Sequence, residues 1–99
     1  MNIQALMKQA QAMQKNLMDS KKKIEEMTFE GISELVTVKI NGKREVISVK
    51  IKENMNLEQE DIEILEDMII LAMNDALKKV EKEINNKLGS QAGALGGLL

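Results

Sequence analysis

The 99-residue sequence predicts an α+β fold in the order helix, three strands, helix, followed by a short tail. Two observations lead to this order. Apolar side chains recur every three or four residues in two long stretches, which is the period of an amphipathic helix. Between these stretches, apolar and polar side chains alternate on both sides of Asn41 and Gly42, which is typical of a β-hairpin. We therefore expect one domain over residues 1–88 and a flexible Gly-rich tail over residues 89–99.

The first helix is expected to run from Ile3 to Met27. No glycine or proline interrupts this stretch, and Ser20 is the one polar residue in its apolar seam. The apolar positions of the seam are Ile3, Leu6, Ala10, Met13, Leu17, Ile24 and Met27. About 25 residues at 1.5 Å each would reach roughly 37 Å, which is longer than a domain of this size is wide. The helix should therefore project from the body.

Three strands should follow this helix, the first of them near Phe29, the only aromatic residue of the chain. Asn41-Gly42 favours a two-residue type I′ turn between the second and third strands. This turn would pair Ile40 with Lys43, Val38 with Glu45, and Val36 with Ile47. One face of the hairpin would then be apolar and hold Val36, Val38, Ile40, Ile47, Val49 and Ile51. The other face would be polar and partly basic, with Thr37, Lys39, Arg44, Val46, Ser48 and Lys50.

A second long helix should begin between Leu57 and Asp61. Several carboxylates would lie near its N-terminus, where the helix dipole stabilises negative charge. The segment Met68–Met73 within it is apolar all round. A helix segment without a polar face must be covered on both sides, so we expect the sheet on one side and a second subunit on the other. The sequence therefore predicts a homodimer.

The composition makes most enzyme classes improbable. Without Cys or His, the chain can form neither a thiolate nucleophile nor the usual proton shuttle near neutral pH. Ser20 and Lys23 fit an S-x-x-K pattern, but nothing else in the chain supports an acylating site, so we interpret them as a solvated helix face. The acidic stretch Glu58–Asp67 lacks the glycine and terminal glutamate of a calcium loop. We predict no catalytic residue, no cofactor and no metal site.

No apolar run reaches the length of a membrane span, and the N-terminus does not resemble a signal peptide. We therefore expect a cytoplasmic protein without a membrane partner or a small-molecule substrate. The net charge of −2 conceals a separation of charge, because residues 56–77 hold seven acids and no base. Lysines recur along both helices, namely Lys8, Lys15, Lys22, Lys23, Lys78, Lys79, Lys82 and Lys87. Doubled by a two-fold axis, such basic helices could contact the phosphates of a duplex without aromatic stacking.

Several segments, in order along nearly the whole chain, are similar to one known family. They are Leu6–Gln14, Val36–Lys43, Val49–Ile51, Leu65–Met68, Ala72–Lys79 and the Gly-rich tail. Together they resemble the YbaB/EbfC family of small bacterial nucleoid-associated proteins. The resemblance implies an α-β-β-β-α subunit with a three-stranded antiparallel sheet, a tweezer-like homodimer, and double-stranded DNA binding at the helical arms. We carry this location over to the eight lysines named above.

The predicted function is therefore that of a protein of the nucleoid, without catalytic activity, that organises DNA and influences transcription. The alternative is a coiled-coil-type protein-interaction adaptor whose heptad arms bind another helix, with its acidic segment facing a basic partner. A salt titration on duplex DNA separates the two hypotheses, because a phosphate-binding protein loses affinity steeply as salt is added.

Overall fold

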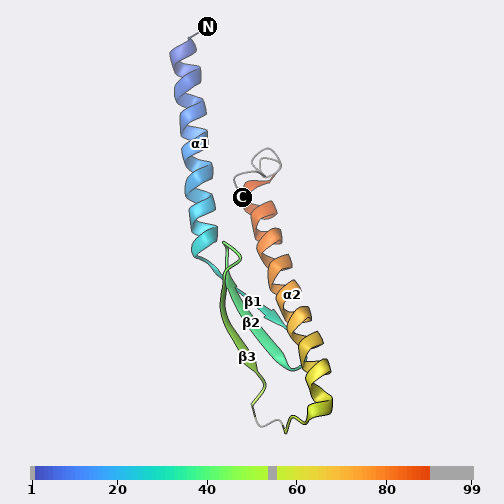
Figure 1. Cartoon of the computed structure of the whole chain (residues 1–99). Helices are drawn as coiled ribbons and strands as arrows, with labels where there is room; N and C mark the ends of the chain where they lie inside the picture. Colours follow the sequence, from blue (N-terminus) through green and yellow to red (C-terminus); the bar gives the residue numbers. More distant parts are fainter. Residues whose placement is uncertain (1, 54–55, 90–99) are drawn as a thin grey trace.

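The computed structural model describes residues 2–53 and 56–89 (Figure 1). The elements are α1 (Ile3–Glu26), β1 (Thr28–Ile32), β2 (Val36–Asn41), β3 (Val46–Ile51), the 3-10 turn η1 (Gln59–Asp61) and α2 (Ile62–Leu88). The strands form one antiparallel sheet in the order β1-β2-β3. The predicted α+β order and both long helices are confirmed. The predicted tail lies, beyond Gly89, outside the described residues.

α1 projects from the body as a single helix of 24 residues (Figure 1). The Asn2 side chain caps its N-terminus, because Asn2 Oδ1 accepts hydrogen bonds from the N–H groups of Gln4 at 3.1 Å and Ala5 at 3.4 Å. Only the C-terminal part is packed, with Leu17 half-buried and Ile24 buried. The described residues before Leu17 are all exposed, so the prediction of a projecting helix is confirmed.

The core lies between α2 and the strands β1 and β2. Its buried apolar residues are Ile24, Phe29, Val36, Val38, Ile40, Ala72, Ala76, Val80, Ile84 and Leu88. α2 and β1 approach closely at Gly31, where an added Cβ would overlap the carbonyl oxygen of Ala72 and crowd Ala76. Small residues on both elements therefore allow this tight contact. Among the described residues, no helix is long and apolar enough to cross a membrane.

The predicted register of the hairpin is wrong. Instead of the expected partners, the observed pairs are Val36–Ile51, Thr37–Lys50, Val38–Val49, Lys39–Ser48 and Ile40–Val46. A register shift beside Ile40 leaves Ile47 as the extra residue of a bulge. Because directly opposite residues point to the same side, Val49 and Ile51 still share a face with the buried valines of β2, as predicted. Val46, predicted on the polar face, instead lies opposite Ile40.

The turn causes this difference, because it has three residues rather than two. The N–H of Asn41 donates to the Glu45 carbonyl at 3.0 Å, and the N–H of Arg44 donates to the Asn41 carbonyl at 3.0 Å. Arg44 has a φ of 66°, which completes a type I turn followed by a left-handed residue. The Asn41 side chain stabilises this form, since Oδ1 accepts from the N–H groups of Lys43 at 2.9 Å and Glu45 at 3.0 Å. Arg44 thus lies in the turn and not on the polar face.

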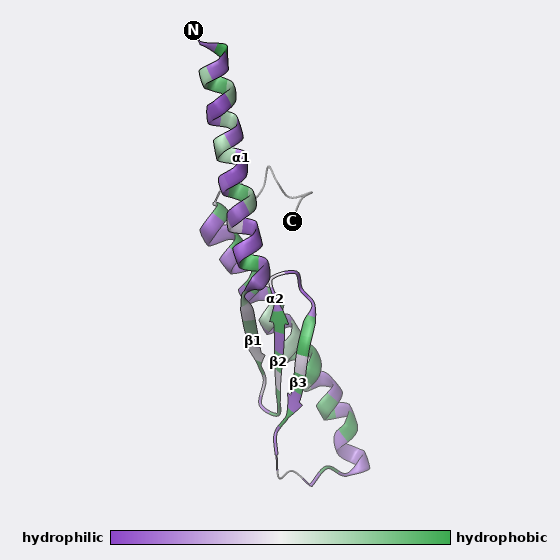
Figure 2. Ribbon diagram, turned by 90° about the vertical axis from the view of Figure 1, so that its left-hand side faces the viewer, coloured by the Kyte–Doolittle hydropathy of each residue, from purple (hydrophilic) through white to green (hydrophobic). Residues whose placement is uncertain are grey.

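The two edges of the sheet differ in how they are covered. At the β1 edge, the Ile32 N–H donates to Asp75 Oδ2 at 2.9 Å, and Lys79 Nζ donates to the Glu30 carbonyl at 2.6 Å. Side chains of α2 therefore satisfy outward-facing backbone groups of β1. Among the described residues, α2 packs on β1 and β2 and not on β3. Figure 2 shows β3 at the opposite edge of the sheet from β1. The exposed apolar residues of β3 are Val46, Ile47, Val49 and Ile51.

The start of α2 matches the prediction closely. η1 precedes the helix, and the N–H of Glu58 donates to Asp61 Oδ2 at 3.0 Å. In the apolar segment Met68–Met73, Ala72 is buried beneath the sheet, whereas Ile70 and Leu71 are 57% and 55% exposed. The expected cover by the sheet is confirmed, and the expected cover by a second subunit stays a prediction.

Candidate nucleic-acid interface

Three lysines follow one side of the projecting helix α1. Lys8, Lys15 and Lys22 are seven residues apart, so neighbours lie about 10.5 Å apart along the helix axis. All three are exposed, and none has a carboxylate of the described residues within ion-pair distance. At about 100° per residue, they lie on the side of α1 opposite Leu6 and Leu17. We call these three residues the lysine stripe. A phosphate backbone on this stripe would leave the apolar seam uncovered.

The predicted lysine Lys23 lies near the stripe but not on it. Lys23 is exposed in the last turn of α1, where its charge also complements the C-terminal end of the helix dipole. It can reach an anion only near the base of the arm.

The four predicted lysines of α2 do not form a single surface. Lys78 and Lys82 are exposed one turn apart, as predicted for a phosphate-binding face. Lys79 is different, because its Nζ is bonded to the Glu30 carbonyl and lies 3.3 Å from Asp75 Oδ2. Lys79 therefore connects α2 to β1, and its predicted contact with DNA stays a prediction. Lys87 lies beside α1, since it lines a hollow together with Leu17.

Asp75 is the second residue of α2 that connects this helix to β1. The hydrogen bond from the Ile32 N–H is the main cause that lowers the pKa of Asp75 below its usual value of 3.8, and the Lys79 ammonium acts in the same direction. The lower pKa means that the folded chain favours the charged carboxylate. Asp75 should therefore stabilise the contact between α2 and β1 whenever it is ionised.

We expect Asp75→Asn to lower the thermal unfolding midpoint at neutral pH. Because the folded-state pKa lies below the unfolded one, the contribution of the carboxylate is complete above the unfolded value and is lost as the pH falls through the folded value. The difference in midpoint between wild type and variant should therefore shrink from about pH 7 to about pH 3, as followed by circular dichroism. Asp67→Asn, an exposed position on the same helix, is the control. A difference that stays constant with pH would contradict this role for Asp75.

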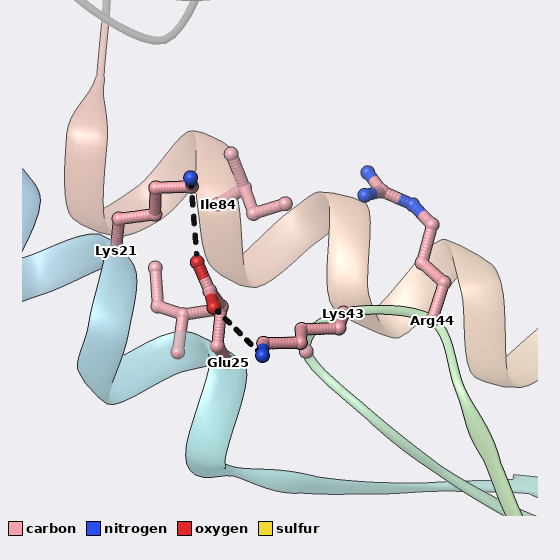
Figure 3. A pocket seen from close by; sticks show the side chains of 7 residues that line it. Lys21, Glu25, Lys43, Arg44 and Ile84 are labelled. Atoms are coloured by element: carbon pink, nitrogen blue, oxygen red, sulfur yellow. Dashed lines mark ion pairs between the residues drawn. The ribbon is translucent and has the colours of Figure 1, made fainter. Parts of the chain in front are cut away.

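The structure also brings together basic residues that the sequence prediction omitted. Lys21, Lys43 and Arg44 line one cavity at the base of α1 together with Glu25 (Figure 3). Glu25 forms ion pairs with Lys21 at 3.4 Å and with Lys43 at 3.8 Å. The spacing of Lys21 and Glu25 on the helix could have indicated the first pair. The approach of the turn depends on tertiary packing at Gly42, which no local pattern reveals.

A model of the YbaB/EbfC DNA-binding family matches residues 1–95. The chain belongs to this family. A relative in Lachnoclostridium phytofermentans, named a nucleoid-associated protein, is 45% identical over 97 residues, which cover 96% of this chain and 81% of the relative. A nucleoid-associated protein of Lactococcus lactis subsp. lactis is also 45% identical, over 91 residues that cover 90% of this chain and 91% of the relative.

The fold of this YbaB/EbfC chain is also found in a solved structure. A crystal structure of an uncharacterized protein of Helicobacter pylori superposes with a TM-score of 0.70 and 25% sequence identity, covering 87% of this chain and 91% of the other. Within residues 2–53 and 56–89, no group of three acidic, His or Cys side chains is arranged to hold a metal ion.

Proposed function

We propose that this chain is a nucleoid-associated protein that binds double-stranded DNA as a homodimer, organises the nucleoid and influences transcription. The observation that carries the proposal is the lysine stripe on a helix that projects into solvent. Membership of a family described as DNA-binding supports it, as do relatives named nucleoid-associated proteins. The function requires no cofactor, small-molecule substrate or catalytic residue, and its place is the nucleoid in the cytoplasm.

The uncovered surface of the subunit supports the homodimer. The apolar residues of β3 and the outer side of α2, including Ile70 and Leu71, are exposed together with Ile62 and Ile64. Apolar surface of this extent on a short chain is typical of a protein interface. A two-fold interface that covers β3 would also repeat the lysine stripe, so that two α1 arms serve one duplex. The assembly would then have the tweezer shape expected for the family.

The proposed mechanism is electrostatic. The part of the chain that the structure describes has one aromatic side chain, Phe29, and it is buried in the core. Stacking on bases is therefore not available there, and the affinity must come from lysine contacts with phosphates. The acidic start of α2 lies at the opposite end of the molecule from the N-terminus of α1 (Figure 1), so its repulsion of DNA is weakest at the arm. Such contacts position the DNA but do not read its bases. Any preference among duplexes should therefore depend on the shape of the DNA and not on contacts with base edges.

A salt titration on a labelled duplex tests this function. If the dimer neutralises about six phosphates, the logarithm of the association constant should fall with the logarithm of the salt concentration at a slope of about −5. Fluorescence anisotropy measures this slope directly. Absence of duplex binding at low salt, or an affinity that salt does not change, would contradict the proposal.

The second candidate is the protein-interaction adaptor, and the apolar seam of α1 favours it. Ile3 is 69% exposed and Leu6 is 49% exposed on a helix that nothing described covers at this end. A helix with such a seam can pair with another helix. An adaptor without DNA affinity would show no binding in the titration at any salt concentration, so the same experiment decides between the two functions.

A further inference from the structure

A basic cavity lies where the β2–β3 turn meets the C-terminal end of α1 (Figure 3). Its lining comes from α1, the turn and α2, and consists of Lys21, Ile24, Glu25, Gly42, Lys43, Arg44 and Ile84. Three cationic side chains and one carboxylate make this lining positively charged. The volume of about 270 Å³ is below the roughly 300–1,000 Å³ of pockets that enclose small-molecule ligands. The cavity therefore suits one anionic group rather than a whole cofactor.

Backbone packing at Gly42 fixes one wall of the cavity. Gly42 is buried, and its N–H donates to the Glu25 carbonyl at 3.3 Å. A Cβ at this position would overlap the backbone of Ile24, so only glycine allows the turn to approach α1 this closely. The turn and the base of the arm are therefore in direct backbone contact.

Hydrogen bonds within the turn fix the backbone of Lys43 and Arg44. Asn41 Oδ1 accepts from the Lys43 N–H, and Asn41 Nδ2 donates to Glu45 Oε1 at 2.9 Å. Arg44 occupies the left-handed position at which hairpins of this type favour glycine. Unfavourable backbone positions of this kind cluster at ligand-binding sites. An arginine at this position indicates a role for its guanidinium beyond forming the turn.

The Glu25 carboxylate contacts the ammonium groups of both lysines in the lining, at 3.4 Å for Lys21 and 3.8 Å for Lys43. Figure 3 shows the Arg44 side chain extending from the turn next to Lys43. The Lys43 side chain is 59% exposed, and its distance of 3.8 Å from Glu25 leaves it able to turn toward a ligand. Lys43 also lines a neighbouring hollow together with Lys22 and the carboxylates Glu25, Glu26 and Glu45. Lys43 therefore lies between the cavity and Lys22, the last residue of the lysine stripe.

We propose that this cavity binds a phosphodiester group of the DNA backbone, with Lys43 and Arg44 as its main contacts. The guanidinium fork matches two phosphate oxygens, and the ammonium group adds a charged donor. This inference rests on the proposed DNA-binding function and adds one phosphate contact per subunit at the base of α1. Lys43 borders the hollow that Lys22 also lines, so a strand bound along the stripe would end close to this contact.

The double variant Lys43→Gln/Arg44→Gln tests the site in the full-length protein. Loss of one phosphate contact in each subunit removes two per dimer, so the salt slope should become shallower by about 1.8. The affinity for a short labelled duplex at low salt should fall at least about tenfold. Lys50→Gln/Lys52→Gln removes the same charge from the other end of the hairpin and should leave the slope within about 0.5 of wild type. The charge-retaining variant Lys43→Arg/Arg44→Lys should keep most of the slope.

Amide chemical shifts of the wild-type protein provide a second measurement that does not depend on variant stability. Titration with duplex should shift the amide signals of Gly42 and Lys43 but not that of Lys52. If inorganic phosphate shifts these signals and duplex does not, the cavity takes free phosphate and the DNA assignment is overturned. If duplex shifts neither signal, or if the double variant keeps the wild-type slope, the site is also overturned, while a salt-dependent wild type would still support the proposed function. Failure of the wild type to bind duplex would instead contradict the proposed function itself.

Discussion

Reversing the charge of the lysine stripe should abolish measurable duplex binding. In the variant Lys8→Glu/Lys15→Glu/Lys22→Glu, three phosphate contacts per arm become three repulsions, on a helix whose described residues before Leu17 are all exposed. The affinity at low salt should fall by more than about 100-fold, and the steep salt slope should disappear. Folding should survive, because the three side chains are exposed and glutamate is as good a helix former as lysine. Anisotropy and circular dichroism report the two results.

The matched control reverses three lysines on or next to the sheet, with Lys39→Glu/Lys50→Glu/Lys52→Glu. The net charge changes by the same amount, but these residues are exposed at the hairpin and away from the projecting part of α1. The affinity of this sheet variant for duplex should fall only slightly, because the added carboxylates repel DNA over a long distance and salt screens such repulsion beyond about 10 Å. Loss of binding by the sheet variant together with retention by the stripe variant would place the duplex on the sheet and refute the proposed interface.

Lysines of α2 are a less informative target than the sequence indicates. The sequence does not distinguish Lys79 from Lys78, because the two are neighbours in the same predicted helix. In the folded chain Lys79 instead bonds the Glu30 carbonyl, 49 residues away. A charge reversal there would place a carboxylate beside Asp75 and weaken the contact with β1. The structure therefore favours Lys78 and Lys82 as the α2 lysines to change.

The helices could be predicted because their signals are local. The apolar seams of α1 and α2 repeat over more than six turns each, which no other element can produce. The hairpin could be placed but its register could not, since Asn41-Gly42 is compatible with turns of two or three residues. The deciding contacts were those of the Asn41 side chain with the N–H groups of Lys43 and Glu45. The sequence indicates such hydrogen bonds from a side chain to the turn less clearly than the Asn-Gly dipeptide indicates a turn.

The basic cavity could not be predicted because it depends on contacts between distant segments. The sequence places Lys43 and Arg44 in a hairpin and Lys21 in a helix, with nothing that brings them together. The fold joins them because the N–H of Gly42 reaches the Glu25 carbonyl at the last turn of α1. The lysine stripe, by contrast, follows from spacing alone. Sequence reasoning thus predicted the lysine stripe, whose part in DNA binding stays a prediction, and omitted the basic residues that packing brings together.

Placing a charge on the uncovered face of β3 should dissociate the homodimer. Val49 is 48% exposed in the subunit, so an aspartate there remains hydrated while the chain is alone. In an interface that covers β3, each subunit would bury this unpaired charge at a cost of about 3 kcal/mol. Two symmetric copies would weaken association by roughly 10⁴-fold. We therefore expect Val49→Asp to be monomeric at micromolar concentration, whereas wild type should scatter light as about twice 11.1 kDa.

Ser48→Asp is the matched control, because Ser48 pairs with Lys39 on the opposite face of the same strand. It should remain dimeric, since that face is polar and lies outside the predicted interface. Stability should separate the two variants as well, because burial of β3 in the dimer links folding to association. The unfolding midpoint of wild type and Ser48→Asp should rise with protein concentration, and that of Val49→Asp should be lower and independent of it. If Val49→Asp is dimeric, the interface does not include β3. If the wild type is monomeric, the two arms are not paired, and the proposal that a dimer binds DNA is contradicted.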